Sequence, residues 1–174
     1  VLKLREFFEG YVEWAIAAGC AAIEYGYPKT ANDIDIIMRK KDLARARRLM
    51  EMLTPTEIIT HSKPTEYTGF KIALYNTDIE FFADPVFHTS QGTFTYSADD
   101  EMFNHTRRIM LKERDFIPVI SPEDTLAFYA LRQSREKYDE IRIKHILAKQ
   151  LIDKELLLRR IQKIGEEKAY ERAS

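Results

Sequence analysis

Two aspartates, Asp33 and Asp35, stand two residues apart in the segment 31–38. The isoleucines beside them are typical of a β-strand. Alternate side chains of a strand point to opposite faces, so the two carboxylates share one face and Ile34 and Ile36 share the other. Carboxylates this close repel each other unless a cation lies between them, and Mg²⁺ prefers hard oxygen ligands. The spacing therefore predicts a metal site, although the wet face of an ordinary strand has the same pattern.

A segment containing glycine precedes this acidic strand. Residues 2–17 carry apolar side chains at helical spacing and predict a helix that ends at Gly19. The apolar run 20–25 predicts a first strand, and 26–30, with its glycine and proline, predicts a turn. Backbone N–H groups beside a glycine can approach a phosphate closely, so Gly19 predicts an anion-binding turn next to the metal site.

A second pair of acids lies in a predicted hairpin. Residues 69–75 and 78–83 alternate apolar and polar side chains, and residues 84–85, Asp-Pro, are expected to end the second strand. Asp78 and Glu80 share one face of that strand. On the residues alone, they are either further site carboxylates or the solvent-facing side of the hairpin.

The remaining elements are read from periodicity and helix-start signals. The run 121–124, Ser-Pro-Glu-Asp, is a typical helix start, because serine caps, proline suits the first helical position and acids favour the positive helix end. Its two acids are interpreted as structural. The other elements expected are a helix at 42–53, a strand at 57–61, an irregular loop or strand at 88–100, a hairpin at 107–111 and 116–120, a linker at 134–136, and helices at 138–149 and after Asp153, fraying beyond 165.

Composition narrows the class of protein. The chain has 174 residues and a formal net charge of −1, so it has no overall attraction for nucleic acid. Basic residues on the predicted helix 42–53 indicate either a solvated face or a local contact with a nucleotide or nucleic acid. The single cysteine, Cys20, excludes an intrachain disulfide and is typical of the reducing cytoplasm. No apolar run approaches the ~20 residues that span a bilayer, so no membrane is expected.

The motifs in this order resemble a known family. Gly19-Cys20, then Gly26-Tyr27-Pro28-Lys29, then Asp33-Ile34-Asp35 is similar to the signature of the minimal nucleotidyltransferases of the DNA polymerase β-like superfamily. The run 121–128, Ser-Pro-Glu-Asp-Thr-Leu-Ala-Phe, resembles a helix start in the branch that includes abortive-infection toxin nucleotidyltransferases. The resemblance spans roughly residues 15–150.

The sequence departs from that pattern at four positions. Cys20 stands where glycine or serine is usual, and Tyr129 stands where a lysine is common. Lys29 replaces a frequent arginine, and Ala31 replaces a frequent threonine. Positive charge is therefore kept at residue 29 and lost at residue 129.

The resemblance implies a fold and an organisation of the chain. The fold class is α/β (α+β), a small mixed β-sheet with helices on one side followed by C-terminal helices. Residues 1–120 would form the nucleotidyltransferase core, and 121–174 a helical segment packed on it within one continuous domain.

The resemblance also assigns two sets of residues to the site. Carboxylates would hold Mg²⁺ or Mn²⁺, namely Asp33, Asp35 and Glu80, with Asp78 in reserve. Residues of the preceding segment would contact the nucleotide, namely Gly19, Cys20 and Lys29.

The implied activity is transfer of an NMP group from an NTP, such as ATP, to a hydroxyl on RNA, a protein or a small molecule. Two alternatives stay open. One is a catalytically degenerate module that binds a nucleotide or a protein. The other is a toxin-like component whose partner is an antitoxin.

Overall fold

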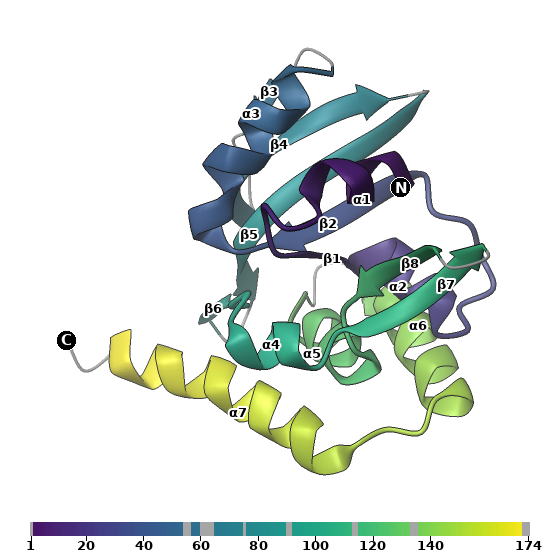
Figure 1. Cartoon of the computed structure of the whole chain (residues 1–174). Helices are drawn as coiled ribbons and strands as arrows, with labels where there is room; N and C mark the ends of the chain where they lie inside the picture. The colour runs from purple at the N-terminus through teal and green to yellow at the C-terminus, as the bar shows by residue number, and fades with distance from the viewer. Residues whose placement is uncertain are drawn as a thin grey trace.

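The computed structural model describes residues 2–53, 57–59, 65–74, 76–89, 92–112, 115–132 and 136–171. Its strands are β1 (Trp14–Ile16), β2 (Asp33–Met38), β3 (Glu57–Ile59), β4 (Thr65–Leu74), β5 (Thr77–Thr89), β6 (Gly92–Thr95), β7 (Arg107–Lys112) and β8 (Asp115–Val119). In the described residues these strands form one eight-stranded mixed sheet in the order β3-β4-β5-β2-β1-β8-β7, with β6 paired to β5 (Figure 1).

Helices connect and cover the strands. They are α1 (Leu2–Phe8), α2 (Ala18–Glu24), the short 3₁₀ helix η1 (Lys40–Asp42), α3 (Leu43–Glu51), α4 (Asp100–Asn104), α5 (Pro122–Arg132), α6 (Glu136–Lys149) and α7 (Lys154–Glu171). None of the helices in the described residues is long and apolar enough to cross a membrane.

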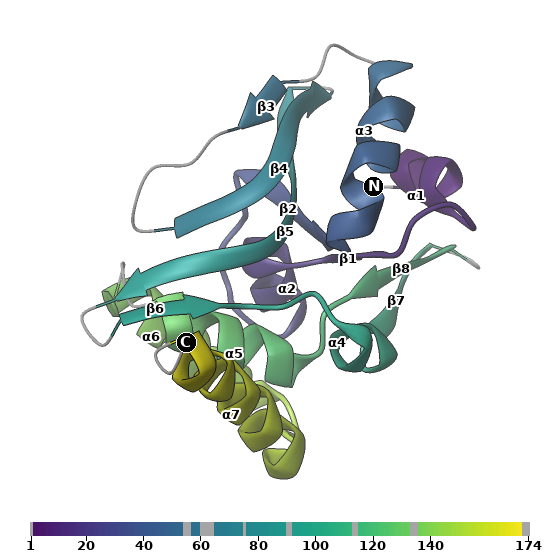
Figure 2. The ribbon, with the colours of Figure 1, turned by 90° about the vertical axis from the view of Figure 1, so that its left-hand side faces the viewer.

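Both faces of the sheet are covered by helices (Figure 2). Phe81 and Phe82 are neighbours on β5 and therefore point to opposite faces. Phe81 packs against Phe8 of α1, with ring centroids 5.7 Å apart, and stacks on Phe70 of β4. Phe82 lies 6.5 Å from the ring of Phe128 on α5. The predicted α/β class with a mixed sheet is confirmed, and the helical layer expected on one face is joined by α1 and α3 on the other.

The N-terminal segment differs from the prediction. The helix expected over 2–17 ends at Phe8, and Trp14–Ile16 form strand β1. The strand expected at 20–25 is instead helix α2. All three residues of β1 are buried, because the strand is central in the sheet and helices cover both faces of the sheet. Without an exposed face, a short apolar run has no alternation to distinguish a strand from a buried helix.

Strand β5 continues past the predicted stop at 84–85 and ends at Thr89. Its pairing with β4 shifts between Glu66 and Thr68, which places Asp84 and Pro85 at an irregularity of the ladder. Asp84 has a φ of 45°, and its side chain accepts a hydrogen bond from the Ala98 N–H at 3.1 Å. Proline is tolerated in strands at such bulges, so the Asp-Pro pair bends the strand without ending it.

Most of the other predicted elements are confirmed within a few residues. They are α3, the β4–β5 hairpin, the β7–β8 hairpin, α5, α6 and α7. The segment 88–100, expected to be irregular, contains β6 and leads into the unpredicted α4. The strand expected at 57–61 is present as β3, while residues 60–61 and the linker residues 134–135 lie outside the described residues. Helix α7 extends past 165 to Glu171.

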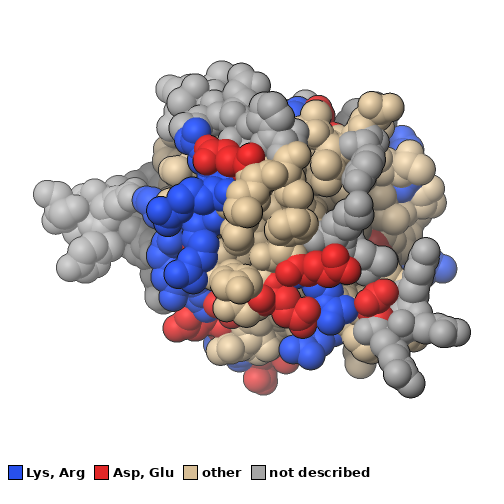
Figure 3. Space-filling model, turned by 45° about the horizontal axis from the view of Figure 1, so that its top comes forward, with Lys and Arg blue, Asp and Glu red and all other residues tan. Residues whose placement is uncertain are grey.

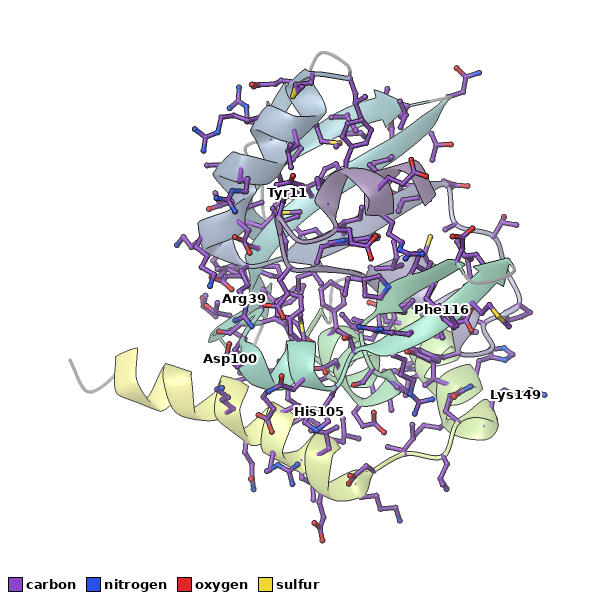
Figure 4. All side chains as sticks on the ribbon, viewed as in Figure 1. Tyr11, Arg39, Asp100, His105, Phe116 and Lys149 are labelled. Atoms are coloured by element: carbon purple, nitrogen blue, oxygen red, sulfur yellow. The ribbon has the colours of Figure 1, made fainter. Side chains whose placement is uncertain are left out.

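Arg39, at the end of β2, ties the sheet to α4. Its guanidinium pairs with Glu13 and with Asp100, 2.7 Å away, and lies 4.7 Å from the centre of the Phe103 ring (Figure 4). The contact with Phe103 adds a cation–π attraction to the two ion pairs. This cluster fixes α4 against the end of the acidic strand.

A buried charge network anchors α7. Arg160 is 2% exposed, and its guanidinium donates to the carboxylates of Asp124 at 2.7 Å and Asp99 at 2.9 Å. Asp124 is fully buried and also accepts from the Tyr96 hydroxyl at 2.7 Å. A buried charge is costly unless it is paired and hydrogen-bonded, so these contacts hold α7 on α5.

The helix start at 121–124 is structural, as predicted. Ser121 caps α5 by accepting from the Asp124 N–H at 3.0 Å. The Glu123 carboxylate accepts from the Asp153 N–H at 2.9 Å, and Asp153 in turn caps α7. The acids of this motif therefore join α5 to α7, through the cap residue Asp153 and through Arg160, in addition to favouring the start of α5.

Candidate active site

The parallel pairing of β2 and β5 brings the acids together. The register places Asp33 beside Asp78 and Asp35 beside Glu80. A cavity of about 350 Å³ opens on this face of the sheet, and Asp33, Asp35 and Glu80 line it. Asp78 is outside the lining and forms an ion pair with Lys71, 2.6 Å away. The geometry therefore puts the three preferred carboxylates on one wall and the reserve residue beyond it.

Glu80 is held by a tyrosine that the sequence did not single out. The Tyr67 hydroxyl donates to Oε2 of Glu80 at 3.0 Å, and its ring lies 5.4 Å from that of Phe82. Burial, followed by the charge of Glu80 and this hydrogen bond, raises the pKa of Tyr67 well above its usual range. Tyr67 therefore stays protonated and remains a donor to the carboxylate.

The donor set suits a hard divalent cation. Carboxylate oxygens are the ligands that Mg²⁺ and Mn²⁺ take, and three of them come from adjacent strands on one cavity wall. Among the described residues, no three His, Cys, Asp or Glu side chains converge closely enough to coordinate an ion as they stand. Like charges on neighbouring side chains keep apart, so rotation of these carboxylates would be part of cation binding.

Helix α2 forms the wall next to the acids. Gly19 lies in its first turn, preceded by Ala18, whose φ of 45° is in the left-handed region. Both line the cavity. A Cβ on Gly19 would lie 3.6 Å from the Ala31 Cβ, an ordinary contact, so the protein around it does not itself require glycine. A side chain at position 19 would instead extend into the cavity.

The other two predicted nucleotide contacts lie away from the cavity wall. Cys20 is not among the lining residues, and its thiol donates to the Asp33 carbonyl oxygen at 3.5 Å. Burial, followed by the charges of Asp35 and Asp33, raises the pKa of Cys20 to about 11. Lys29 is exposed and also outside the lining.

Aromatic residues and one arginine complete the cavity. Tyr27, Phe82, Phe87 and Phe128 are among its lining residues. Arg142 of α6 also lines it, from the helix that the sequence predicted at 138–149 without assigning it to the site. Its guanidinium lies over the rings of Tyr27 and Tyr129, so the tyrosine found where the resemblance expects lysine is packed against a cation.

The basic helix α3 does not contribute to the cavity. It packs against the opposite face of the sheet, and none of the described lining residues comes from it. Its exposed cations and those of η1 form a band on the surface (Figure 3), namely Lys40, Lys41, Arg45 and Arg48.

The sequence and the fold were compared with those of known proteins. No protein-family model and no curated protein matches the sequence. Solved structures do match. TM1012 from Thermotoga maritima, assigned as a nucleotidyltransferase, superposes with a TM-score of 0.62 at 18% identity, covering 80% of this chain and 86% of that one.

Two antibiotic-modifying enzymes have similar structures. The lincosamide adenylyltransferase LnuA, bound to lincomycin, gives a TM-score of 0.53 at 17% identity, covering 86% of this chain and 93% of that one. ANT(2'')-Ia in complex with adenylyl-2''-tobramycin gives a TM-score of 0.57 at 12% identity, covering 95% of this chain and 93% of that one. At identities this low, the superposition establishes the fold alone, and the activity has to be argued from the site. This chain therefore has the nucleotidyltransferase fold that the resemblance predicted.

Proposed function

We propose that this chain is a divalent-metal-dependent nucleotidyltransferase that moves an NMP group from an NTP to a hydroxyl acceptor. The observation that carries the proposal is the placement of Asp33, Asp35 and Glu80 on one cavity wall by the parallel register of β2 and β5. An unrelated solvated strand face would explain the acids of one strand. It would not explain matching acids on the neighbouring strand, facing the same cavity.

Asp33, Asp35 and Glu80 would hold Mg²⁺ or Mn²⁺ in this function. When bound, such ions neutralise the charge that develops on the attacking and leaving oxygens of an in-line displacement. Tyr67 orients one of the three carboxylates through its hydrogen bond to Glu80. Gly19 leaves room at the α2 wall for the phosphates of the nucleotide.

The reaction forms one bond and breaks another at the α-phosphorus. The acceptor oxygen bonds to that phosphorus, the bond to the β-phosphate oxygen breaks, and pyrophosphate leaves. The proton of the acceptor hydroxyl passes to the carboxylate of Glu80 or Asp35, acting as a general base. Most of the rate enhancement in such a transfer comes from positioning and electrostatic stabilisation, which a fixed set of charged side chains supplies.

ATP is the nucleotide that the comparisons favour, and a small hydroxylated molecule is the favoured acceptor. LnuA is an adenylyltransferase bound to lincomycin, and ANT(2'')-Ia was solved with adenylyl-2''-tobramycin. The cavity, about 350 Å³ with aromatic side chains on its wall, has the size and lining of a small-molecule site.

Calorimetric titration of ATP, GTP, CTP and UTP, each with and without Mg²⁺, tests the proposal. Wild type is expected to bind ATP only with the metal, and Asp35→Asn is expected to lose that binding. Asp78→Asn is the matched control, because Asp78 pairs with Asp33 in the same register but lies outside the cavity. Its exposed ion pair with Lys71 contributes little to stability, so it should bind like wild type.

Turnover is measured as pyrophosphate release with lincomycin and with tobramycin as acceptors. Release that needs Mg²⁺ and disappears in Asp35→Asn would support transfer to a small molecule. Metal-dependent ATP binding without release from any acceptor would instead favour the degenerate nucleotide-binding module. Unchanged ATP binding in folded Asp35→Asn would contradict the assignment of the metal site.

A further inference from the structure

One cationic side chain lines the same cavity as the acids. Among the described residues that line it, Arg142 is the only lysine or arginine. It comes from α6, far in sequence from the acidic strands. Its side chain is partly exposed, at 21%, so it is accessible from the cavity that it lines.

Three contacts fix the plane of this guanidinium. Nη1 of Arg142 donates to Oδ1 of Asp139 at 2.9 Å, one turn earlier on the same helix. Its central carbon lies 5.3 Å from the ring centre of Tyr27 and 5.1 Å from that of Tyr129. Cation–π contacts on two rings and a buried carboxylate hold the side chain in one orientation before any ligand arrives.

The protein leaves most hydrogen-bonding capacity of this group unused. Within the described residues, Arg142 makes one hydrogen bond, the one to Asp139. Its buried Nε has no hydrogen-bond partner there. A guanidinium has five N–H donors in a planar fork. The Arg142 side chain lines the cavity and only its Nη1 bonds Asp139, so the remaining N–H donors of its two NH₂ groups are available to a ligand there.

Phosphate oxygens match these donors best. The fork of arginine recognises phosphate with parallel charge-assisted hydrogen bonds. Tyr27, on which Arg142 packs, follows α2, whose Gly19 lines the same wall next to the acids. A polyphosphate chain extending along α2 from a cation held by the acids would thus meet Arg142.

We propose that Arg142 binds the polyphosphate chain of the nucleotide, beyond the phosphate that is transferred. This inference rests on the proposed nucleotidyltransferase function. It assigns the acids to the reacting end of the nucleotide and Arg142 to the departing pyrophosphate end.

Three variants test this assignment. Arg142→Met keeps the apolar stem but removes charge and donors, and Arg142→Lys keeps the charge but removes the fork. Arg107→Met is the matched control, since Arg107 also lies over a tyrosine ring, that of Tyr25 at 5.6 Å, but is outside the cavity. Each protein is titrated calorimetrically, in the presence of Mg²⁺, with ATP, with AMP and with inorganic tripolyphosphate.

Arg142→Met is expected to weaken binding of ATP and tripolyphosphate by roughly ten- to a hundredfold, the range of a charge-assisted hydrogen bond. AMP, which lacks the polyphosphate, should lose less than about threefold. Arg142→Lys should fall between wild type and Arg142→Met, and Arg107→Met should match wild type. If Arg142→Met does not fold, the test rests on Arg142→Lys, which should bind ATP more weakly than wild type and bind AMP equally well.

The outcomes separate this inference from the proposed function. If folded Arg142→Met binds ATP as well as wild type does, the role of Arg142 is overturned and the proposed nucleotidyltransferase function is unaffected. An equal loss for AMP and ATP also overturns it, because the polyphosphate would then not be the contact. Wild type that binds tripolyphosphate through Arg142 but no nucleotide overturns the proposed function alone. Wild type that binds neither overturns both.

Discussion

The hydroxyl of Tyr67 donates a hydrogen bond to Oε2 of Glu80, 3.0 Å away, from the strand next to the one that carries the carboxylate. Glu80 lines the cavity, and Tyr67 lines it beside Glu80. The tyrosine thus acts on the proposed chemistry through the glutamate, as a positioning residue.

Tyr67→Phe is expected to lower kcat by about tenfold or more, because a charge-assisted hydrogen bond to the site carboxylate is lost. The ring contact with Phe82 remains, so the melting temperature should change little. The check is steady-state kinetics of Tyr67→Phe, of Glu80→Gln and of the double variant. If Tyr67 acts through Glu80, its substitution has little further effect once Glu80 is glutamine. Additive losses would refute this coupling.

Two glycine-to-alanine substitutions should have opposite consequences. Gly19→Ala adds a Cβ at an ordinary 3.6 Å from Ala31, so we expect normal stability and weaker ATP binding as the methyl group fills the cavity. Gly69→Ala would place a Cβ 2.1 Å from the Phe81 carbonyl oxygen, which forces the backbone to move. A loss of about 1–3 kcal/mol in the free energy of unfolding is expected there.

Urea denaturation and ATP titration of both glycine variants separate these effects. Each variant serves as the other's control, since the chemical change is identical. A strongly destabilised Gly19→Ala would indicate that Gly19 is needed by the fold rather than by the ligand.

Asp99 should contribute to stability in a pH-dependent way. Burial alone would raise the pKa of Asp99, but hydrogen bonds from Lys163 and the Met102 N–H and the charge of Arg160 together lower it below its usual range. A carboxyl with a lowered pKa in the folded state stabilises the protein above its unfolded pKa of about 3.9, and this stability is lost as pH falls through the folded value.

The free energy of unfolding, measured in urea between pH 7 and pH 2, should therefore fall below about pH 4 for wild type. Asp99→Asn should be less stable at neutral pH and show a shallower acid limb, while an asparagine still caps α4. Glu140→Gln is the control, because that carboxylate is exposed on α6 and an exposed charge contributes little to stability. A wild-type slope retained in Asp99→Asn would assign the acid sensitivity to other groups.

Cys20 should react slowly with alkylating agents. The thiolate is the reactive form, and burial together with the charges of Asp35 and Asp33 raises the pKa of Cys20 from 9.0 to about 11. Two pKa units mean about a hundredfold less thiolate at pH 8 than in the unfolded chain. Iodoacetamide labelling followed by mass spectrometry, with and without urea, measures this ratio across pH 7–11. Fast labelling of the folded protein at pH 8 would contradict the buried position of the thiol.

The sequence was sufficient to locate the acidic strand β2 and the β4–β5 hairpin beside it, but not its other neighbour β1. Asp33 and Asp35 alternate with isoleucines, and that local pattern is strong enough to predict β2 as a strand. The preference for Glu80 over Asp78 came from a resemblance; Glu80 lines the cavity, whereas Asp78 lies outside it. Segments with clear alternation or clear caps were thus predictable from short stretches of sequence.

Other parts of the site depend on contacts between distant segments. Tyr67 and Arg142 reach the cavity only through the pairing of β4 with β5 and the packing of α6, and no local pattern distinguishes them. The buried strand Trp14–Ile16 also lacks alternation, since helices cover both faces of the sheet where it lies. Tertiary contact overrides local signal at these positions.

The pairing of Asp124 with Arg160 also bears on how the chain is made in the cell. Asp124 has no exposed surface, and its main cationic partner follows 36 residues later in the chain. A ribosome therefore releases α5 well before the residue that neutralises its buried carboxylate. Domains fold as units during synthesis, and the unpaired charge of Asp124 opposes folding of this domain until Arg160 is available. The nascent chain thus gains its full stability only after α7 has emerged, which leaves α5 open to chaperones and proteases until then.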